Sequence, residues 1–185
     1  MRLFVAAELP EVLLDALSET SALLRGQVRG RYVAPDSFHL TLAFLGEVPS
    51  SQVPDAAAAL DEACAAWPPI PVTLGALGSF GRARGAVLWQ GFASGADELG
   101  GLAGDMRECL AERGLAYDPL AFSPHVTLMR KADIASGVLP MPVVEKGTIE
   151  TVTLFRSDLS GERPLYEPLH SVRLEAVDGT QDPWR

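Results

Sequence analysis

The sequence predicts a fold of mixed helices and strands, with two similar lobes in a single domain spanning residues 1–185. The main observation is an order that occurs twice: a strand, a helix and then a strand that carries a His-x-Thr motif. The histidines of the two motifs, His39 and His125, lie 86 positions apart. Two similar lobes that face each other would bring both motifs together.

The composition narrows the possible classes of protein. A chain of 185 residues supports one substantial core but not several domains. The chain has 15 Lys and Arg and 24 Asp and Glu, which give a net charge of −9. This charge argues against non-specific binding along a nucleic-acid backbone, but it allows a small anionic group to be held locally. The first apolar run is too short for a signal peptide or a membrane span. We expect a cytoplasmic monomer that does not bind membranes.

The elements of the first half follow from hydrophobic periodicity. Leu13, Leu17 and Leu24 share one helical face. In the first motif strand, His39 and Thr41 alternate with apolar residues. We predict a strand at residues 3–8, a helix over 10–26, a motif strand over 38–45 and a helix over 51–66.

The second half repeats this order. Ser94 and Asp97 resemble a capping box before a helix that ends at Gly114. His125 and Thr127 again share one face of a strand. We predict strands at residues 72–79 and 86–92, a helix over 94–114, a motif strand over 121–129, one long strand over 147–156 and a final strand over 165–176.

The residue types of the motifs suit cleavage of a cyclic phosphodiester. Histidine has an unperturbed pKa of about 6.5, so two histidines can divide the donation and acceptance of a proton near neutral pH. The hydroxyls of Thr41 and Thr127 and the charge of Arg130 can stabilise a phosphoryl group in the transition state. Neither motif contains a carboxylate, and no cluster has metal-ligand spacing. The pattern favours acid–base catalysis without a metal or another cofactor.

Several of these residues also have a structural explanation. A single strand histidine is more often a hydrogen-bonded structural residue, and a strand threonine follows ordinary β preference. His170, which has no threonine in register, fits such a structural or exposed role. Only the paired register of both motifs favours catalysis. Arg82 and Arg84 fit an exposed hairpin tip better than an RNA contact, and Phe4, Phe38 and Phe122 fit the core.

Four segments resemble a known family, the two-histidine phosphoesterases, and specifically the RNA 2',3'-cyclic phosphodiesterases once called 2'-5' RNA ligases. The segments are Arg2–Ala6, His39–Glu47, Pro124–Arg130 and Arg163–Leu169. The paired His-x-Thr blocks are highly specific, and the two end segments are weaker. The resemblance covers almost the whole chain.

The resemblance implies a bilobal α+β fold of the LigT type, with a cleft between two antiparallel sheets and helices on the outside. It also implies hydrolysis of RNA 2',3'-cyclic phosphate ends to 2'-phosphate ends, with weak, reversible joining of tRNA halves. The same resemblance implies that His39 is the proton donor, that His125 is the proton acceptor, and that Thr41 and Thr127 bind phosphate. The pseudo-symmetry makes the donor and acceptor roles exchangeable from sequence alone.

Three other hypotheses fit the same residues. The same chemistry could act on another cyclic phosphate, such as a cyclic ADP-ribose phosphate, or on a 2'-5' oligonucleotide, because the motifs recognise phosphate and not the base. A non-catalytic module could bind RNA ends through the histidines, which would give binding without turnover. A metal-dependent hydrolase could combine the histidines with a distant carboxylate, and activity in excess chelator would exclude it.

Overall fold

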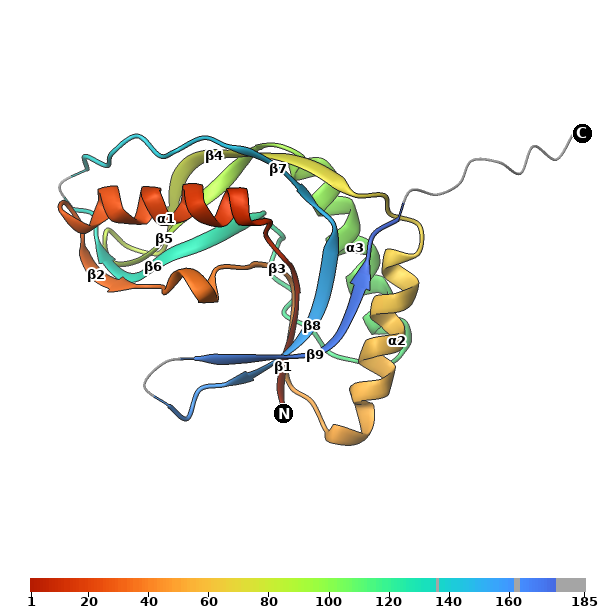
Figure 1. The fold of residues 1–185 in the computed structure, drawn as a ribbon. Helices are drawn as coiled ribbons and strands as arrows, with labels where there is room; N and C mark the ends of the chain where they lie inside the picture. The colour runs from red at the N-terminus through yellow and green to blue at the C-terminus, as the bar shows by residue number, and fades with distance from the viewer. Residues whose placement is uncertain (136, 162–163, 176–185) are drawn as a thin grey trace, which may run out of the picture.

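The computed structural model describes residues 1–135, 137–161 and 164–175, and within them it contains two antiparallel sheets (Figure 1). The first sheet has the order β3-β1-β8-β9, with β1 at Arg2–Ala7, β3 at Leu40–Glu47, β8 at Thr151–Asp158 and β9 at Leu165–Arg173. The second sheet has the order β2-β6-β5-β4-β7, with β2 at Arg29–Tyr32, β4 at Ile70–Phe80, β5 at Arg84–Ser94, β6 at His125–Asp133 and β7 at Lys146–Ile149. The predicted α+β architecture is confirmed.

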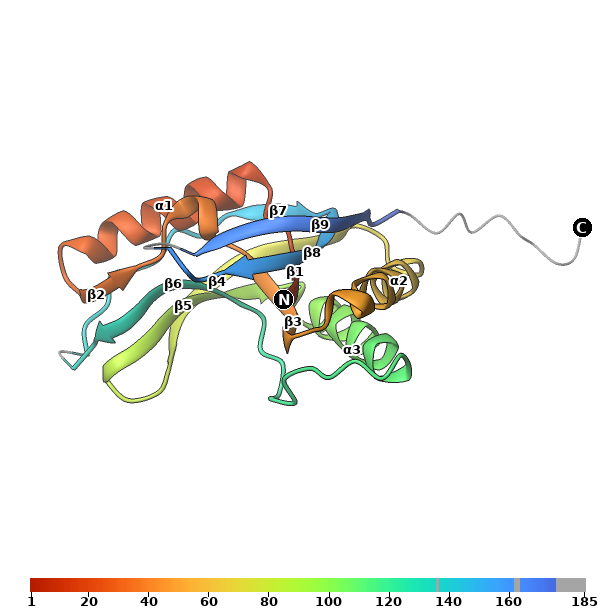
Figure 2. The same cartoon turned by 90° about the horizontal axis from the view of Figure 1, so that it is seen from below.

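The helices lie outside the sheets, as predicted (Figures 1 and 2). They are α1 at Glu11–Arg25, α2 at Val53–Cys64 and α3 at Ala96–Glu112, with short 3₁₀ turns η1 at Pro35–Ser37 and η2 at Ser50–Gln52. Helix α2 contacts β8 and β9, α3 contacts β3, β4 and β5, and α1 contacts β7. No helix of the described segments has the length and apolar character needed to cross a membrane.

The two sheets do not correspond to the two halves of the chain. Strand β4, from the first half, joins the second sheet, and β8 and β9 return from the C-terminal part to complete the first sheet. This exchange places the two motif strands in different sheets: β3 at the edge of the four-stranded sheet and β6 next to β2 in the five-stranded sheet. Each sheet therefore contributes one motif.

The prediction of one long strand over residues 147–156 is wrong. The chain bends at Glu150, so that β7 pairs with β4 in one sheet and β8 pairs with β1 and β9 in the other. The end of β9 holds the bend, since the Leu174 amide donates to the Glu150 carbonyl at 2.7 Å and Arg173 forms an ion pair with the Glu150 carboxylate at 3.0 Å. The apolar pattern runs through this bend without interruption, so periodicity could not locate it.

The predicted capping box of α3 is also wrong. The residue before the helix is Gly95, with φ of +81°, and the Ser94 hydroxyl donates to the Thr73 hydroxyl at 2.8 Å instead of capping the helix. A Cβ at Gly95 would lie 2.6 Å from the Pro71 carbonyl oxygen, so this turn requires glycine. Strand β2 was not predicted, because Arg29–Tyr32 has no apolar alternation. The last predicted strand ended at Ala176, outside the described residues.

A fully buried glutamine ties the second sheet to the segment that precedes β7. The Gln90 side-chain amide on β5 donates to the Gly75 carbonyl on β4 at 3.1 Å and to the Val143 carbonyl at 2.8 Å. Gln90 is the register partner of Val126, the residue between His125 and Thr127. This side chain therefore lies directly beneath the second motif.

We expect Gln90→Leu to lower the free energy of unfolding by about 1–3 kcal/mol, because two buried carbonyls would lose their donor. Urea unfolding monitored by circular dichroism measures the change. The matched control is Gln27→Leu at an exposed position, where we expect almost no change. Equal effects of the two substitutions would contradict this role of Gln90.

Candidate active site

A cavity of about 950 Å³ lies where the two sheets approach each other through β3 and β6. Its walls come from β1, the end of α1, β2, η1, β3, β6 and the hairpin between β8 and β9. Four of the five predicted site residues line it: His39, Thr41, Thr127 and Arg130. His125, at the start of β6, does not line the cavity, but its charge acts on His39. The structure thus brings both motifs to one place.

The local chain path before β3 sets the orientation of His39. The 3₁₀ turn η1 ends at Ser37, and the Ser37 carbonyl oxygen lies 2.8 Å from His39 Nδ1. A carbonyl can only accept a hydrogen bond, so Nδ1 carries the proton in neutral His39 and Nε2 keeps its lone pair. The ring packs against Phe4 and Tyr166, with centroid distances of 5.0 and 5.1 Å, and these two rings also contact each other.

His125 has the same arrangement in the other sheet. Its Nδ1 lies 2.7 Å from the Ser123 carbonyl oxygen, again two residues earlier in the chain. Its ring contacts Phe80 and Trp89, with centroid distances of 5.0 and 5.8 Å. The two imidazoles therefore share one tautomer and one mode of support, and in each of them Nε2 remains for proton transfer.

Both histidines have a lowered pKa. Burial lowers the pKa of His39 below its ordinary 6.5, the bond to the Ser37 carbonyl opposes this shift, and the positive charges of Arg130 and His125 lower the pKa further. Burial and the Arg130 charge lower the pKa of His125 in the same way, against the bond to Ser123. A proton on His125 thus disfavours a proton on His39. Burial and the neighbouring positive charges therefore favour the neutral form of both histidines.

A β-bulge follows the threonine in each motif strand. In β6, Thr127 pairs with Trp89 and Met129 pairs with Leu88, which leaves Leu128 as an extra residue. In β3, Thr41 pairs with Ala6 and Ala43 pairs with Val5, so Leu42 is extra in the same way. A bulge changes which face the following side chains occupy.

The bulges explain how Arg130 reaches the cavity. Strict alternation would place a residue three positions after Thr127 on the opposite face of the strand. With the bulge, Thr127 and Arg130 line the same cavity, as do Thr41 and Phe44 in β3. Phe44 carries no charge, but the Arg2 guanidinium lies 4.7 Å from the centre of its ring and also lines the cavity. Arg130 on β6 and Arg2 beside Phe44 of β3 therefore bring positive charge to the cavity from both sheets.

Sequence reasoning missed three residues of this site, or gave them no role. Phe4 is buried, as predicted for a core residue, but it also lines the cavity. Arg2 and Tyr166 were noted only within segments of family resemblance. Burial raises the pKa of Tyr166, against the charges of Arg130 and Arg2, so its hydroxyl stays protonated and can donate a hydrogen bond. The contacts of these residues depend on tertiary structure and leave no pattern in the sequence.

The other residues considered from the sequence do not line the cavity. Arg82 and Arg84 are exposed at the tip between β4 and β5, as predicted. His170 Nε2 lies 2.7 Å from the Asp61 carboxylate of α2, a contact that fits the structural or exposed role expected from the sequence. Phe38 is buried, whereas Phe122 is only half-buried beneath the Arg107 guanidinium.

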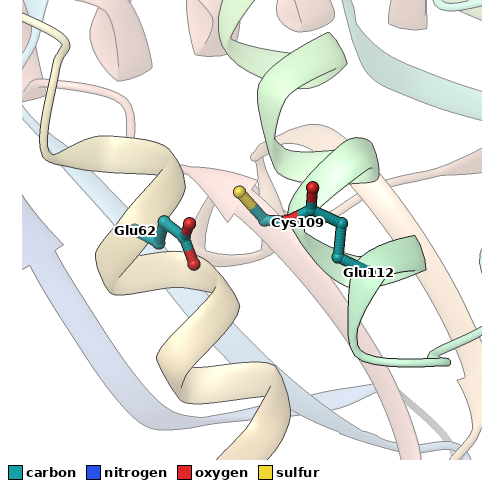
Figure 3. Close-up of side chains that lie close together, drawn as sticks. All are labelled: Glu62, Cys109 and Glu112. Carbon is teal, nitrogen blue, oxygen red and sulfur yellow. The ribbon is translucent and has the colours of Figure 1, made fainter.

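One cluster of potential metal ligands lies outside the cavity, between α2 and α3. Figure 3 shows Glu62 facing Cys109 and Glu112, and their ligand atoms lie within 4.8 Å of one another. Glu62 already pairs with Arg113 at 2.5 Å. Burial and the two carboxylates raise the pKa of the Cys109 thiol, which disfavours the thiolate that a metal needs. These residues therefore do not fit a metal centre, and they lie outside the candidate active site.

Comparisons with known proteins agree with this geometry. The family model described as LigT-like phosphoesterase matches residues 8–89. An RNA 2',3'-cyclic phosphodiesterase of Thermus thermophilus is 31% identical over 190 aligned positions, which cover 98% of this chain and 94% of that protein. The protein of the same name from Escherichia coli is 33% identical over 168 positions, covering 91% and 93%.

Solved structures show the same relationship. The crystal structure of E. coli LigT with 3'-AMP has a TM-score of 0.77 and 30% identity, and the match covers 94% of this chain and 97% of that one. A Thermus thermophilus structure has a TM-score of 0.73 and 32% identity, with coverage of 94% and 98%. The resemblance expected from the motifs is thus confirmed, and the chain belongs to the LigT-like phosphoesterase family.

Proposed function

We propose that the protein hydrolyses the 2',3'-cyclic phosphate at the end of an RNA chain to a 2'-phosphate, by acid–base catalysis that needs no metal. The observation that carries the proposal is the matched pair of histidines, each with Nδ1 held by a backbone carbonyl and Nε2 left for proton transfer. The names of the relatives support the substrate class. Suitable substrates include the ends of tRNA halves, and we expect a cytoplasmic monomer.

In the proposed reaction, His125 Nε2 accepts a proton from water as the water oxygen attacks phosphorus. The bond between phosphorus and the ribose 3' oxygen breaks, and protonated His39 Nε2 donates a proton to that leaving oxygen. Each transfer contributes about 10²- to 10⁴-fold to the rate. The lowered pKa of His39 makes its protonated form a stronger acid, which suits the donor role.

Negative charge increases on the non-bridging phosphoryl oxygens in the transition state. The Thr41 and Thr127 hydroxyls and the Arg130 guanidinium line the cavity beside His39 and are suited to stabilise this charge. If a 5'-hydroxyl replaces water as the nucleophile, the same groups join two RNA ends through a 2'-5' linkage. We expect this ligation to be weak and reversible.

We expect His39→Asn and His125→Asn each to lower kcat/KM by about 10²- to 10⁴-fold on a short RNA that ends in a 2',3'-cyclic phosphate. The assay is run in excess chelator, and the terminal phosphate of the product is identified as 2' or 3'. His170→Asn is the matched control, because this histidine pairs with Asp61 outside the cavity. Full activity of either motif variant, or loss of wild-type activity in chelator, would reject the mechanism.

The lowered pKa values predict an acidic optimum for kcat/KM, which reports on the free enzyme. The productive form holds one proton on the pair of histidines, so activity falls at high pH when the pair loses this proton and at low pH when the pair gains a second one. Because both pKa values lie below the ordinary 6.5, we expect the maximum below pH 6.5. A bound anionic phosphate stabilises protonated His39, so the optimum of kcat lies at a higher pH. A kcat/KM maximum above pH 7 would contradict this assignment.

A further inference from the structure

The cavity has a charge opposite to that of the whole protein. Although the chain has a net charge of −9, four arginines line the cavity and, among its described lining residues, none is Asp or Glu. They are Arg2, Arg25, Arg31 and Arg130. The cyclic phosphate at the reaction centre carries a single negative charge, so the cavity contains more positive charge than this group requires.

The four arginines form two groups. Arg130 acts on the pKa of both motif histidines, and Arg2 and Arg130 act on Tyr166, so these two lie at the reaction centre. Arg25 instead acts on the pKa of Tyr32. Arg25 is the last residue of α1, and Arg31 lies on β2. In Figures 1 and 2, β2 and the end of α1 lie together at one end of the molecule. The cavity therefore has a basic arm, which consists of Arg25, Arg31 and Tyr32.

The contacts in the basic arm hold its charges in place. The Arg25 guanidinium lies 4.5 Å from the centre of the Tyr32 ring, a cation–π arrangement that restrains the side chain. The Tyr32 hydroxyl donates to the Val28 carbonyl at 2.8 Å, which fixes the ring itself. An arginine restrained in this way loses less entropy when it binds an anion.

Arg31 connects the basic arm to the reaction centre. It is the register partner of Arg130 across the β2–β6 ladder, and both line the cavity. Residues directly opposite each other in an antiparallel pair have Cβ atoms about 4.5–5.5 Å apart, and like charges in such a pair are unfavourable. Register partners project from the same face of a sheet, so the Arg31 and Arg130 side chains lie next to each other along the cavity. This arrangement provides positions for a series of phosphates that begins at the reaction centre.

We propose that the basic arm binds the phosphodiester on the 5' side of the terminal nucleotide, so that the protein prefers RNA chain ends to nucleoside 2',3'-cyclic phosphates. This inference rests on the proposed function, because it needs the cyclic phosphate at the two histidines. Guanidinium groups suit the task because they bind phosphate oxygens through paired hydrogen bonds. The acidic charge of the remaining protein limits recognition to the first phosphates of the chain end.

The test compares kcat/KM for adenylyl-adenosine 2',3'-cyclic phosphate with kcat/KM for adenosine 2',3'-cyclic phosphate. We expect the wild type to prefer the dinucleotide by about tenfold or more, since a charged hydrogen bond contributes about 1.5–3 kcal/mol. Arg25→Gln and Arg31→Gln should each reduce this ratio several-fold, and added salt should reduce it in the wild type. Arg29→Gln is the matched control, because Arg29 is on the same strand, pairs in register with Asp133 and does not line the cavity. It should keep the wild-type ratio.

The outcomes separate the two proposals. If the wild type hydrolyses neither compound, the proposed function fails, and the basic arm fails with it. If the wild type hydrolyses both with equal efficiency, or if both arm variants keep the wild-type ratio, only the basic arm is rejected. A loss that affects both substrates by the same factor would also reject it. Arg25 is exposed at the end of a helix, so Arg25→Gln should fold even if Arg31→Gln does not.

Discussion

The hydrogen bond from each motif histidine to the carbonyl two residues earlier is the constraint on which the site depends. This bond keeps the proton of the neutral ring on Nδ1, and it orients the imidazole so that Nε2 is available for proton transfer. This bond requires the chain to turn immediately before each motif strand, which η1 achieves for His39 and the irregular segment before β6 achieves for His125. A pair of neighbouring aromatic rings then packs against each imidazole and holds it in place.

The topology brings the two motif histidines together at one site. Strands β8 and β9 complete the sheet that contains β3, and β4 joins the sheet that contains β6. The two motif strands therefore belong to different sheets, and the cavity forms where these sheets approach each other. The bulges after Thr41 and Thr127 add a second effect, since they bring Phe44 and Arg130 to the cavity. Positive charge then gathers at a site that belongs to an acidic protein.

The sequence predicted the parts of this site that follow a local pattern. The period of two placed each histidine on the same face as its threonine, and apolar periodicity located the three helices to within a few residues. The features that were not predicted share a physical cause. Each depends on contacts between residues that lie far apart in the sequence. The bend at Glu150 is held by the end of β9, and Gly95 is required by the close Pro71 carbonyl. The Arg2 guanidinium lies beside the Phe44 ring of another strand. None of these contacts leaves a periodic signal.

The most direct test of the account is the tautomer of each histidine, measured by ¹⁵N NMR at pH 8 in the wild-type protein. The account predicts the Nδ1–H form for His39 and His125, because each Nδ1 faces a carbonyl that can only accept. His170 provides an internal reference with the opposite form, since its Nε2 faces the Asp61 carboxylate at 2.7 Å. An Nε2–H tautomer in His39 or His125 would contradict the central claim, because that Nε2 would have no lone pair with which to accept a proton.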